Sequence, residues 1–252
     1  TVQSNSLEVI NKHFSRLEPF ALKEFKLNST ISSLPMRFFA KLNKLELLCL
    51  TKCSISNIED NVFENLANLK YLFLNDNKIT DLKQKIFSGL VKLEELNLSR
   101  NKITSIEDNS FKELIELKKL NLTRNKIGVV HKATFSGLVS LEELDLASTG
   151  IWKIDEEAFV ELNKLKKLDI NKTELKSIER GMLDGLYNLE HLNICSLFSC
   201  QIEGDTFDHM TKLKVLNTNK MNIMNREAFS ELKSLKSMRF FTHKMESSDY
   251  IS

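Results

Sequence analysis

The amino-acid sequence predicts an α/β fold: a right-handed, horseshoe-shaped solenoid. Short parallel strands form its concave face, and loops or 3₁₀ turns with little regular helix form its convex face. Three observations lead to this prediction. The motif LxxLxL recurs every 24 residues, an Asn follows several copies at a fixed distance, and a Phe recurs later in each repeat. Repeats of this length are typical of solenoids, in which each unit completes its core against its neighbours.

The strand comes first in each repeat. Alternate side chains of a strand point to opposite faces, so the fourth and sixth positions of LxxLxL turn inward. The regular copies begin at Leu45, Leu69, Leu93, Leu117, Leu141, Leu165 and Leu189, and degenerate copies begin at Leu22, Leu213 and Leu235.

The turn after the strand carries a polar residue at the ninth position of the repeat. A buried Asn amide can both donate to and accept from backbone groups of the turn, and Asn77, Asn101 and Asn125 stand there. Cys53, Thr149 and Thr173 are smaller substitutes, whereas Leu197 and Met221 cannot form such bonds. We therefore expect the repeats from residue 189 onward to be less regular.

The return leg is marked by two apolar positions. An Ile at the eleventh position turns the chain back under the core, and a Phe at the nineteenth predicts a stacked row behind the Leu layer. That row contains Phe63, Phe87, Phe111, Phe135, Phe159 and Phe207, with Leu183 as the one substitute.

The domain prediction is one unit over residues 1–252, with irregular repeats over 1–44, regular repeats over 45–188 and irregular repeats over 189–252. Two Pro and seven Gly argue against a turn-rich sandwich. No apolar run is long enough to span a membrane, and the first residues do not resemble a signal peptide, as would also hold after processing. Neither end shows a cysteine-rich cap. We expect either a fragment or an end covered by a partner, including a second copy.

The repeats resemble the extracellular family of 24-residue leucine-rich repeats, with the form LxxLxLxxNxIxxIxxxxFxxLxx. The opening segment FKLNSTISSLPMRFFAKLNKLELLCL is similar to insect secreted members, leureptin-like and mosquito immune proteins, and Toll-type receptor ectodomains share the repeat. The resemblance implies a secreted, extracellular, non-catalytic recognition module of insect innate immunity, which binds a protein or a microbial surface glycan or lipid.

Charge is nearly balanced, with 36 Lys and Arg against 34 Asp and Glu, so we expect no nucleic-acid partner. The second and third positions alternate in sign from repeat to repeat, as in Glu94-Glu95 followed by Lys118-Lys119. Adjacent strands lie about 4.8 Å apart. This ladder is interpreted as setting register and solubility, with a binding surface as the alternative.

Three other features are candidate contact sites. Leu47, Tyr71 and Phe73 are expected to point outward beside Cys49. This cluster is either a hot spot for contact with a protein partner or a surface that flanking structure covers. Trp152, close to Gly150, is expected to be exposed, and Trp is a residue type that is enriched at interfaces. A basic stripe at the eighth and tenth positions favours an anionic ligand, or is simply a solvated edge. It comprises Lys52, Lys78, Arg100, Lys102, Arg124, Lys126, Lys172 and Lys220.

Glycosylation sequons fall at Asn28, Asn97, Asn121 and Asn171. Sugars on Asn97 and Asn121 would block the middle of the concave face and direct ligands to its edges.

The cysteines give two expectations. Cys53 replaces an inward Asn and is expected to be a buried free thiol, while Cys195 and Cys200 bracket an irregular turn and are candidates for a local disulfide. Their spacing fits no metal site, and the five His occupy unrelated repeat positions, so no metal, cofactor or nucleophile–base pair is expected.

The leading functional hypothesis is therefore a secreted recognition protein, and no enzyme. The alternatives are the ectodomain of a cell-surface receptor or adhesion protein, and a matrix component that assembles through uncapped solenoid ends.

Overall fold

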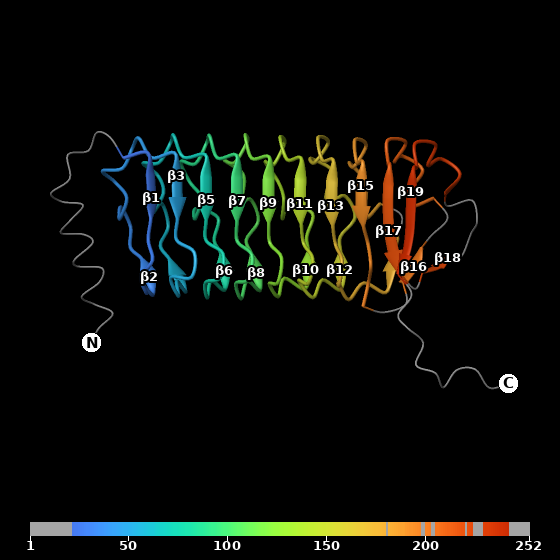
Figure 1. The fold of residues 1–252 in the computed structure, drawn as a ribbon, viewed down its shortest axis with the longest axis horizontal. Coiled ribbons are helices and arrows are strands. Elements are labelled where there is room, and N and C mark those ends of the chain that lie inside the picture. The colour runs from blue at the N-terminus through green and yellow to red at the C-terminus, as the bar shows by residue number, and fades with distance from the viewer. Residues whose placement is uncertain are drawn as a thin grey trace, which may run out of the picture.

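A computed structural model describes residues 22–179, 181–197, 200–202, 205–219, 221–223 and 229–241. One parallel ten-stranded sheet runs along the whole of this part, with each strand hydrogen-bonded to the strand of the next repeat (Figure 1). Its strands are β1 (Glu24–Lys26), β3 (Leu47–Cys49), β5 (Tyr71–Phe73), β7 (Glu95–Asn97), β9 (Lys119–Asn121), β11 (Glu143–Asp145), β13 (Lys167–Asp169), β15 (His191–Asn193), β17 (Val215–Asn219) and β19 (Ser237–Phe241). The predicted solenoid is confirmed.

A second set of short strands follows each turn and was not predicted. These strands pair in parallel with the neighbouring repeat, in small sheets of two or three. They are β2 (Ser33–Leu34), β4 (Asn57–Ile58), β6 (Asp81–Leu82), β8 (Ser105–Ile106), β10 (Val129–Val130), β12 (Lys153–Ile154), β14 (Ser177–Ile178), β16 (Cys200–Ile202) and β18 (Met221–Ile223). Within the described residues, no helix is long or apolar enough to cross a lipid bilayer.

The core lies between the long sheet and the return legs. The inward Leu positions are fully buried, and behind them the predicted Phe row stacks ring on ring, with Phe87 and Phe111 centroids 5.7 Å apart and 12° from parallel. The row is longer than predicted, because Phe39 stacks on Phe63 at 5.9 Å and Phe229 on Phe207 at 5.7 Å. Contacts between equivalent residues of adjacent repeats are therefore the main source of stability.

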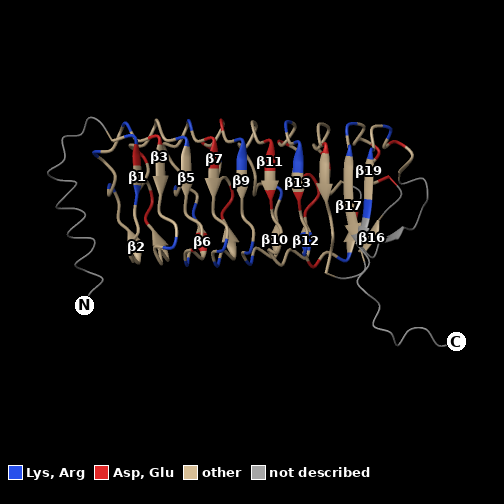
Figure 2. Ribbon diagram, in the orientation of Figure 1, with Lys and Arg blue, Asp and Glu red and all other residues tan. Residues whose placement is uncertain are grey.

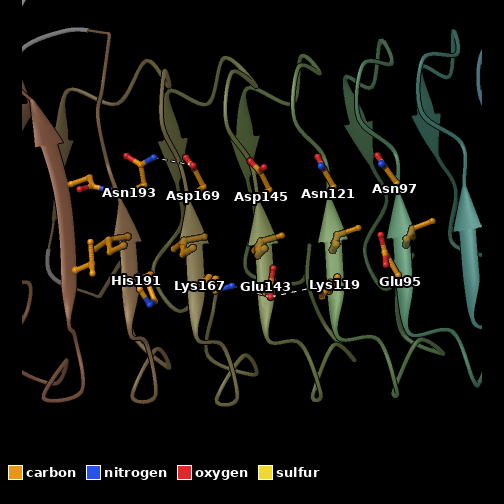
Figure 3. Close-up of a pocket in the computed structure, with 17 residues that line it drawn as sticks. Glu95, Asn97, Lys119, Asn121, Glu143, Asp145, Lys167, Asp169, His191 and Asn193 are labelled. Atoms are coloured by element: carbon orange, nitrogen blue, oxygen red, sulfur yellow. Dashed lines mark hydrogen bonds and ion pairs between the residues drawn. The ribbon is translucent and has the colours of Figure 1, made fainter. Parts of the chain in front are cut away.

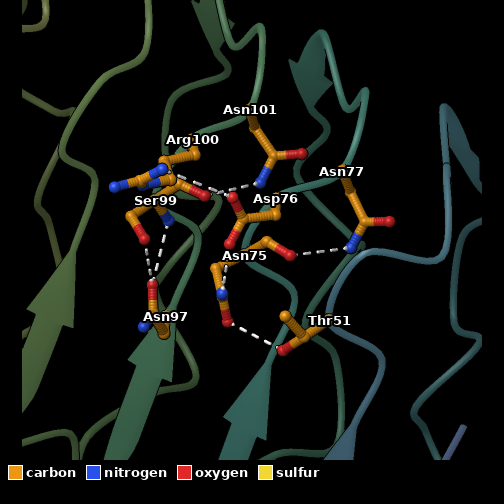
Figure 4. Close-up of polar contacts among 8 residues, drawn as sticks. All are labelled: Thr51, Asn75, Asp76, Asn77, Asn97, Ser99, Arg100 and Asn101. Atoms are coloured by element: carbon orange, nitrogen blue, oxygen red, sulfur yellow. Dashed lines mark hydrogen bonds and ion pairs between the residues drawn. The ribbon is translucent and has the colours of Figure 1, made fainter. Parts of the chain in front are cut away.

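The ninth-position Asn side chains close each turn as predicted (Figure 4). Asn101 Nδ2 donates to the carbonyls of Leu74 and Leu98, both at 2.9 Å, while its Oδ1 accepts the Ile79 N–H at 3.1 Å. Each amide thus joins its own repeat to the preceding one.

The turn around residue 197 is built differently from the regular turns, as expected from its Leu at the ninth position. Leu197 does not take the inward position but is 51% exposed, and Ser196 is buried in its place. The Ser196 hydroxyl donates to the Leu175 carbonyl at 2.6 Å, so this turn is closed by a hydroxyl one residue earlier in the chain.

Candidate ligand-binding surfaces

The second position of the repeats forms a self-neutralising charge ladder. Because the strands are in register, each carboxylate lies beside a Lys of the adjacent turn: Glu94 pairs with Lys118 at 2.7 Å, and Glu142 with Lys166 at 2.8 Å. The Lys166 ammonium lowers the pKa of Glu142. Figure 2 shows the same alternation of sign on β7, β9, β11 and β13. The second-position charges are therefore balanced across adjacent turns, and the role of the ladder in setting register stays a prediction.

A groove of about 450 Å³ runs across the exposed face of the long sheet, from β7 to β17 (Figure 3). We call it the sheet-face groove. Third- and fifth-position side chains form its polar lining: Glu95, Asn97, Lys119, Asn121, Glu143, Asp145, Lys167, Asp169, His191, Asn193 and Asn217. From the sequence, the charged third positions were considered as a binding surface only as the alternative interpretation of the charge ladder, and Asn97 and Asn121 only as sequons.

The fifth position contributes a continuous row of amides and carboxylates along the groove, in the order Asn97, Asn121, Asp145, Asp169, Asn193 and Asn217. Short polar side chains often accept a hydrogen bond from the backbone two residues later. Asn97 Oδ1 accepts the Ser99 N–H at 3.0 Å, Asp145 Oδ1 that of Ala147 at 3.0 Å, and Asp169 Oδ1 that of Asn171 at 2.8 Å. These three side chains are therefore held in place by the backbone before any ligand arrives.

Asp169 is the most perturbed carboxylate of this row. Burial raises its pKa and the nearby Asp145 raises it further, whereas the N–H of Asn171 and the Asn193 amide, which donates at 2.9 Å, oppose the rise. The Oδ1 atoms of Asn193 and Asn217 are buried and accept no hydrogen bond from the described residues.

The groove carries a negative balance. Four carboxylates line it against two ammonium groups, which leaves a formal charge of −2 with His191 neutral. Glu143 lies between the two lysines, 3.6 Å from Lys119 and 3.1 Å from Lys167, so Glu95, Asp145 and Asp169 are the groove carboxylates without a Lys partner among the described residues. A cationic or hydrogen-bond-donating ligand fits this lining.

The predicted hot spot lies beside the groove on the same face. Leu47 pairs in register with Tyr71, and Cys49 with Phe73. Tyr71 is 36% exposed and the other three side chains are half-buried. This aromatic patch continues directly into the groove, because Tyr71 pairs with Glu95 and Phe73 with Asn97 of β7. Its role in binding stays a prediction.

The remaining predicted site residues lie apart from the groove. Seven members of the basic stripe are exposed, and Lys220 lies outside the described residues. Trp152 is 58% exposed, and its Nε1 would be 3.4 Å from a Cβ placed on Gly128, so the glycine of the preceding repeat makes room for the indole. Trp152 borders a separate recess near Glu156 and Glu174.

The sequons occupy different environments. Asn28 is exposed, and Asn171 is half-buried beside the groove. Asn97 and Asn121 line the groove, where the hydroxyls of Ser99 and Thr123 donate to their Oδ1 atoms. Sugars at these two residues would occupy one end of the groove and not its Asp145–Asp169 section.

The predicted disulfide between Cys195 and Cys200 is wrong. Both are free, buried thiols on different sheets, because Cys195 follows β15 of the long sheet whereas Cys200 begins β16 beside β14. Burial raises the pKa of each to about 11. Cys53 is a buried free thiol as expected, and its Sγ donates to the Leu27 carbonyl at 3.4 Å. Among the described residues, no group of His, Cys, Asp or Glu is arranged to hold a metal ion.

Comparison with known proteins gives a family and a likeness to solved structures. A family model described as leucine rich repeat matches residues 21–79, 44–103, 92–151 and 140–196. A search of curated proteins gives no match. Among solved structures, the chain is similar to TLR13 in a TLR13–ssRNA13 complex, with a TM-score of 0.58 and 23% identity. The likeness covers 84% of this chain and 38% of that one, and at this identity it concerns the fold alone.

Proposed function

Because the chain belongs to the leucine-rich-repeat family, we propose that it is a non-catalytic recognition module that holds an extended segment of an extracellular protein on its sheet face. Solenoids of this kind present long rows of side chains to ligands. The observation that carries the proposal is the continuity of the aromatic patch with the sheet-face groove. An apolar anchor and a preformed row of hydrogen-bonding groups lie on one strip.

The spacing of the strip suits an extended peptide. Strands lie about 4.8 Å apart and an extended chain advances about 3.3 Å per residue, so roughly three ligand residues pass over two strands. An aromatic or aliphatic ligand side chain would pack on Tyr71 and Phe73, and a Lys or Arg would reach Asp145 and Asp169.

The biological setting is part of the proposal: secretion and a role in innate defence. It is supported by the resemblance of the 24-residue units with their Phe row to extracellular members, and by the likeness to TLR13. That neighbour was solved with ssRNA13. The negative balance of the groove favours a cationic peptide over RNA here, because nucleic-acid affinity depends on neutralising phosphates with Lys and Arg.

A displayed library of random peptides, selected on the full chain, tests this function. We expect enriched peptides to combine aromatic and basic residues, and Asp145→Asn with Asp169→Asn to weaken them about tenfold, as loss of one charge-assisted hydrogen bond implies. Tyr71→Ser with Phe73→Ser should also weaken them. The charge-matched control, Glu64→Gln with Glu116→Gln, changes two exposed carboxylates away from the groove and should bind normally. Enriched peptides that bind all these variants equally would exclude the sheet face as the site.

A further inference from the structure

Five cations are concentrated on three successive turns of the basic stripe, on the loops that follow β5, β7 and β9. They are Lys78, Arg100, Lys102, Arg124 and Lys126, and all five side chains are exposed. We call them the basic cluster. It ends at the neutral Ser148 and Gly150 on the following turn, whereas the preceding turn has Ser54 at the tenth position and a single cation, Lys52, at the eighth.

The charge of the basic cluster is not balanced by partners. Elsewhere in the molecule, Lys side chains such as Lys118 and Lys166 are paired across turns. Within the described part of the chain, the cluster's one ion pair is a contact of 3.9 Å between Arg100 and Asp76 (Figure 4). Five cations less that carboxylate leave +4 on three turns, whereas the whole chain has a net charge of only +2. A local positive field of this kind attracts polyanions.

The backbone beneath these side chains is rigid. The eighth-position N–H groups donate to the next turn, as from Arg100 to the Thr123 carbonyl at 2.8 Å. The tenth-position N–H groups donate to the preceding turn, as from Lys102 to the Ile79 carbonyl at 2.9 Å. Two lines of cations therefore run along the solenoid, with one step of about 4.8 Å for each turn. A preformed line of charge loses little backbone entropy on binding.

The eighth position also has an unusual backbone. Arg100 has φ of 55° and Arg124 of 56°, in the left-handed region where Asn, Asp and Gly are favoured. Local conformation thus gives no reason for arginine at these two positions. Their long guanidinium side chains instead provide exposed, permanently charged donors on neighbouring turns.

We propose that the basic cluster is a second binding site, separate from the sheet-face groove, for a linear polyanion of the sulfated polysaccharide class. Proteins that bind single-stranded RNA without sequence preference combine cations with aromatic side chains on which bases stack. Residues 75–80, 99–104 and 123–128, which form these turns, contain no aromatic residue, and the exposed Trp152 of the following turn adjoins them at Gly128. Sulfate groups need only charge and hydrogen-bond donors, and Lys and Arg supply both.

Heparin is the probe for this site, and its affinity for the protein is measured over a range of salt concentrations. The test variant replaces Lys78, Arg100, Lys102 and Lys126 with Gln. Its matched control replaces Lys44, Lys83, Lys85 and Lys112, four exposed lysines outside the stripe, with Gln, so both variants lose the same charge. We expect the test variant to lose about one unit of salt slope for each removed contact, and most of its affinity at low salt. The control should keep both.

Three outcomes would overturn the assignment. The first is equal loss of heparin affinity in the test and control variants, with both folded as judged by their urea midpoints. The second is undiminished binding of desulfated heparin. The third is binding of single-stranded RNA as tight as that of heparin at equal charge. Peptides selected on the sheet face should bind the test variant normally, so failure of this site is distinguishable from failure of the groove.

Discussion

Asn101→Ala removes a buried amide that joins two turns of the solenoid. The Asn101 side chain is 7% exposed and makes two good hydrogen bonds to the Leu74 and Leu98 carbonyls, besides accepting the Ile79 N–H. Ala leaves the Ile79 N–H buried without an acceptor, which costs about 1–3 kcal/mol. Each lost bond to a carbonyl costs about 0.5–1.5 kcal/mol more. We therefore expect the free energy of unfolding to fall by roughly 2–6 kcal/mol.

Asn101→Thr is the matched control, because Thr already stands at this position in two other repeats. The Thr149 hydroxyl donates to the Leu146 carbonyl at 2.6 Å, and the Thr173 hydroxyl to that of Ile170 at 2.9 Å. A Thr at 101 should keep the equivalent bond to Leu98 and so cost about 0.5–1.5 kcal/mol less than Ala.

Equilibrium urea unfolding measures both losses, and hydrogen exchange at the Ile79 amide reports the local effect. That amide should lose protection in both variants, because no Thr hydroxyl in the structure accepts the corresponding N–H among the described residues. The reasoning is refuted if Ala costs less than about 1 kcal/mol, or if Thr costs as much as Ala.

Three further predictions concern the core, the groove and its sequons. Phe111→Ala should lower the free energy of unfolding by about 3–5 kcal/mol, and Phe111→Leu by about 1–3 kcal/mol for two lost ring contacts, those with Phe87 and Phe135; a Phe111→Leu variant as stable as the wild type in urea unfolding would contradict ring stacking as a separate contribution. Burial raises the folded-state pKa of Asp169 above its unfolded value. Protonation of Asp169 therefore contributes to the free energy of unfolding below its usual pKa, and this contribution is lost as pH rises through the raised value. Asp169→Asn should therefore be more stable than the wild type at pH near 7, and this gain should vanish in acid; a pH-independent difference in urea midpoint would count against it. A peptide ligand needs room in the groove, so intact-mass analysis of the naturally produced protein should find at most one of Asn97 and Asn121 glycosylated. Sugars on both residues would argue against the sheet face as a peptide site.

The strands, the inward Leu positions and the Phe row were predictable because each depends on position within one repeat. The short strands such as β6 (Asp81–Leu82) were not, because they form only by pairing with the same residues one turn away. Phe39 and Phe229 were missed although they continue the row at spacings of 24 and 22 residues from Phe63 and Phe207. Extending the period into the degenerate repeats would have found them.

The candidate sites were predicted less completely, for a related reason. Tyr71, Trp152 and the exposed cations are recognisable one residue at a time, and the structure places them on the surface. Nothing in the sequence around Asp169 distinguishes it from the other Asp residues. Its burial, its bond to Asn193 and its place in a groove arise only when turns 24 residues apart lie side by side.

The near-zero net charge of the chain conceals two surfaces of opposite sign. Third and fifth positions face the groove and give it a formal charge of −2, whereas eighth and tenth positions give the basic cluster +4. The repeats that begin at Leu93 and Leu117 contribute to both surfaces, since Asn97 and Asn121 line the groove while Arg100 and Arg124 belong to the cluster. The ladder of second positions neutralises itself across turns and leaves both fields in place. The turn after each strand separates the two charges, so the two proposed sites, for a cationic peptide on the sheet and for a polyanion on the flank, do not overlap.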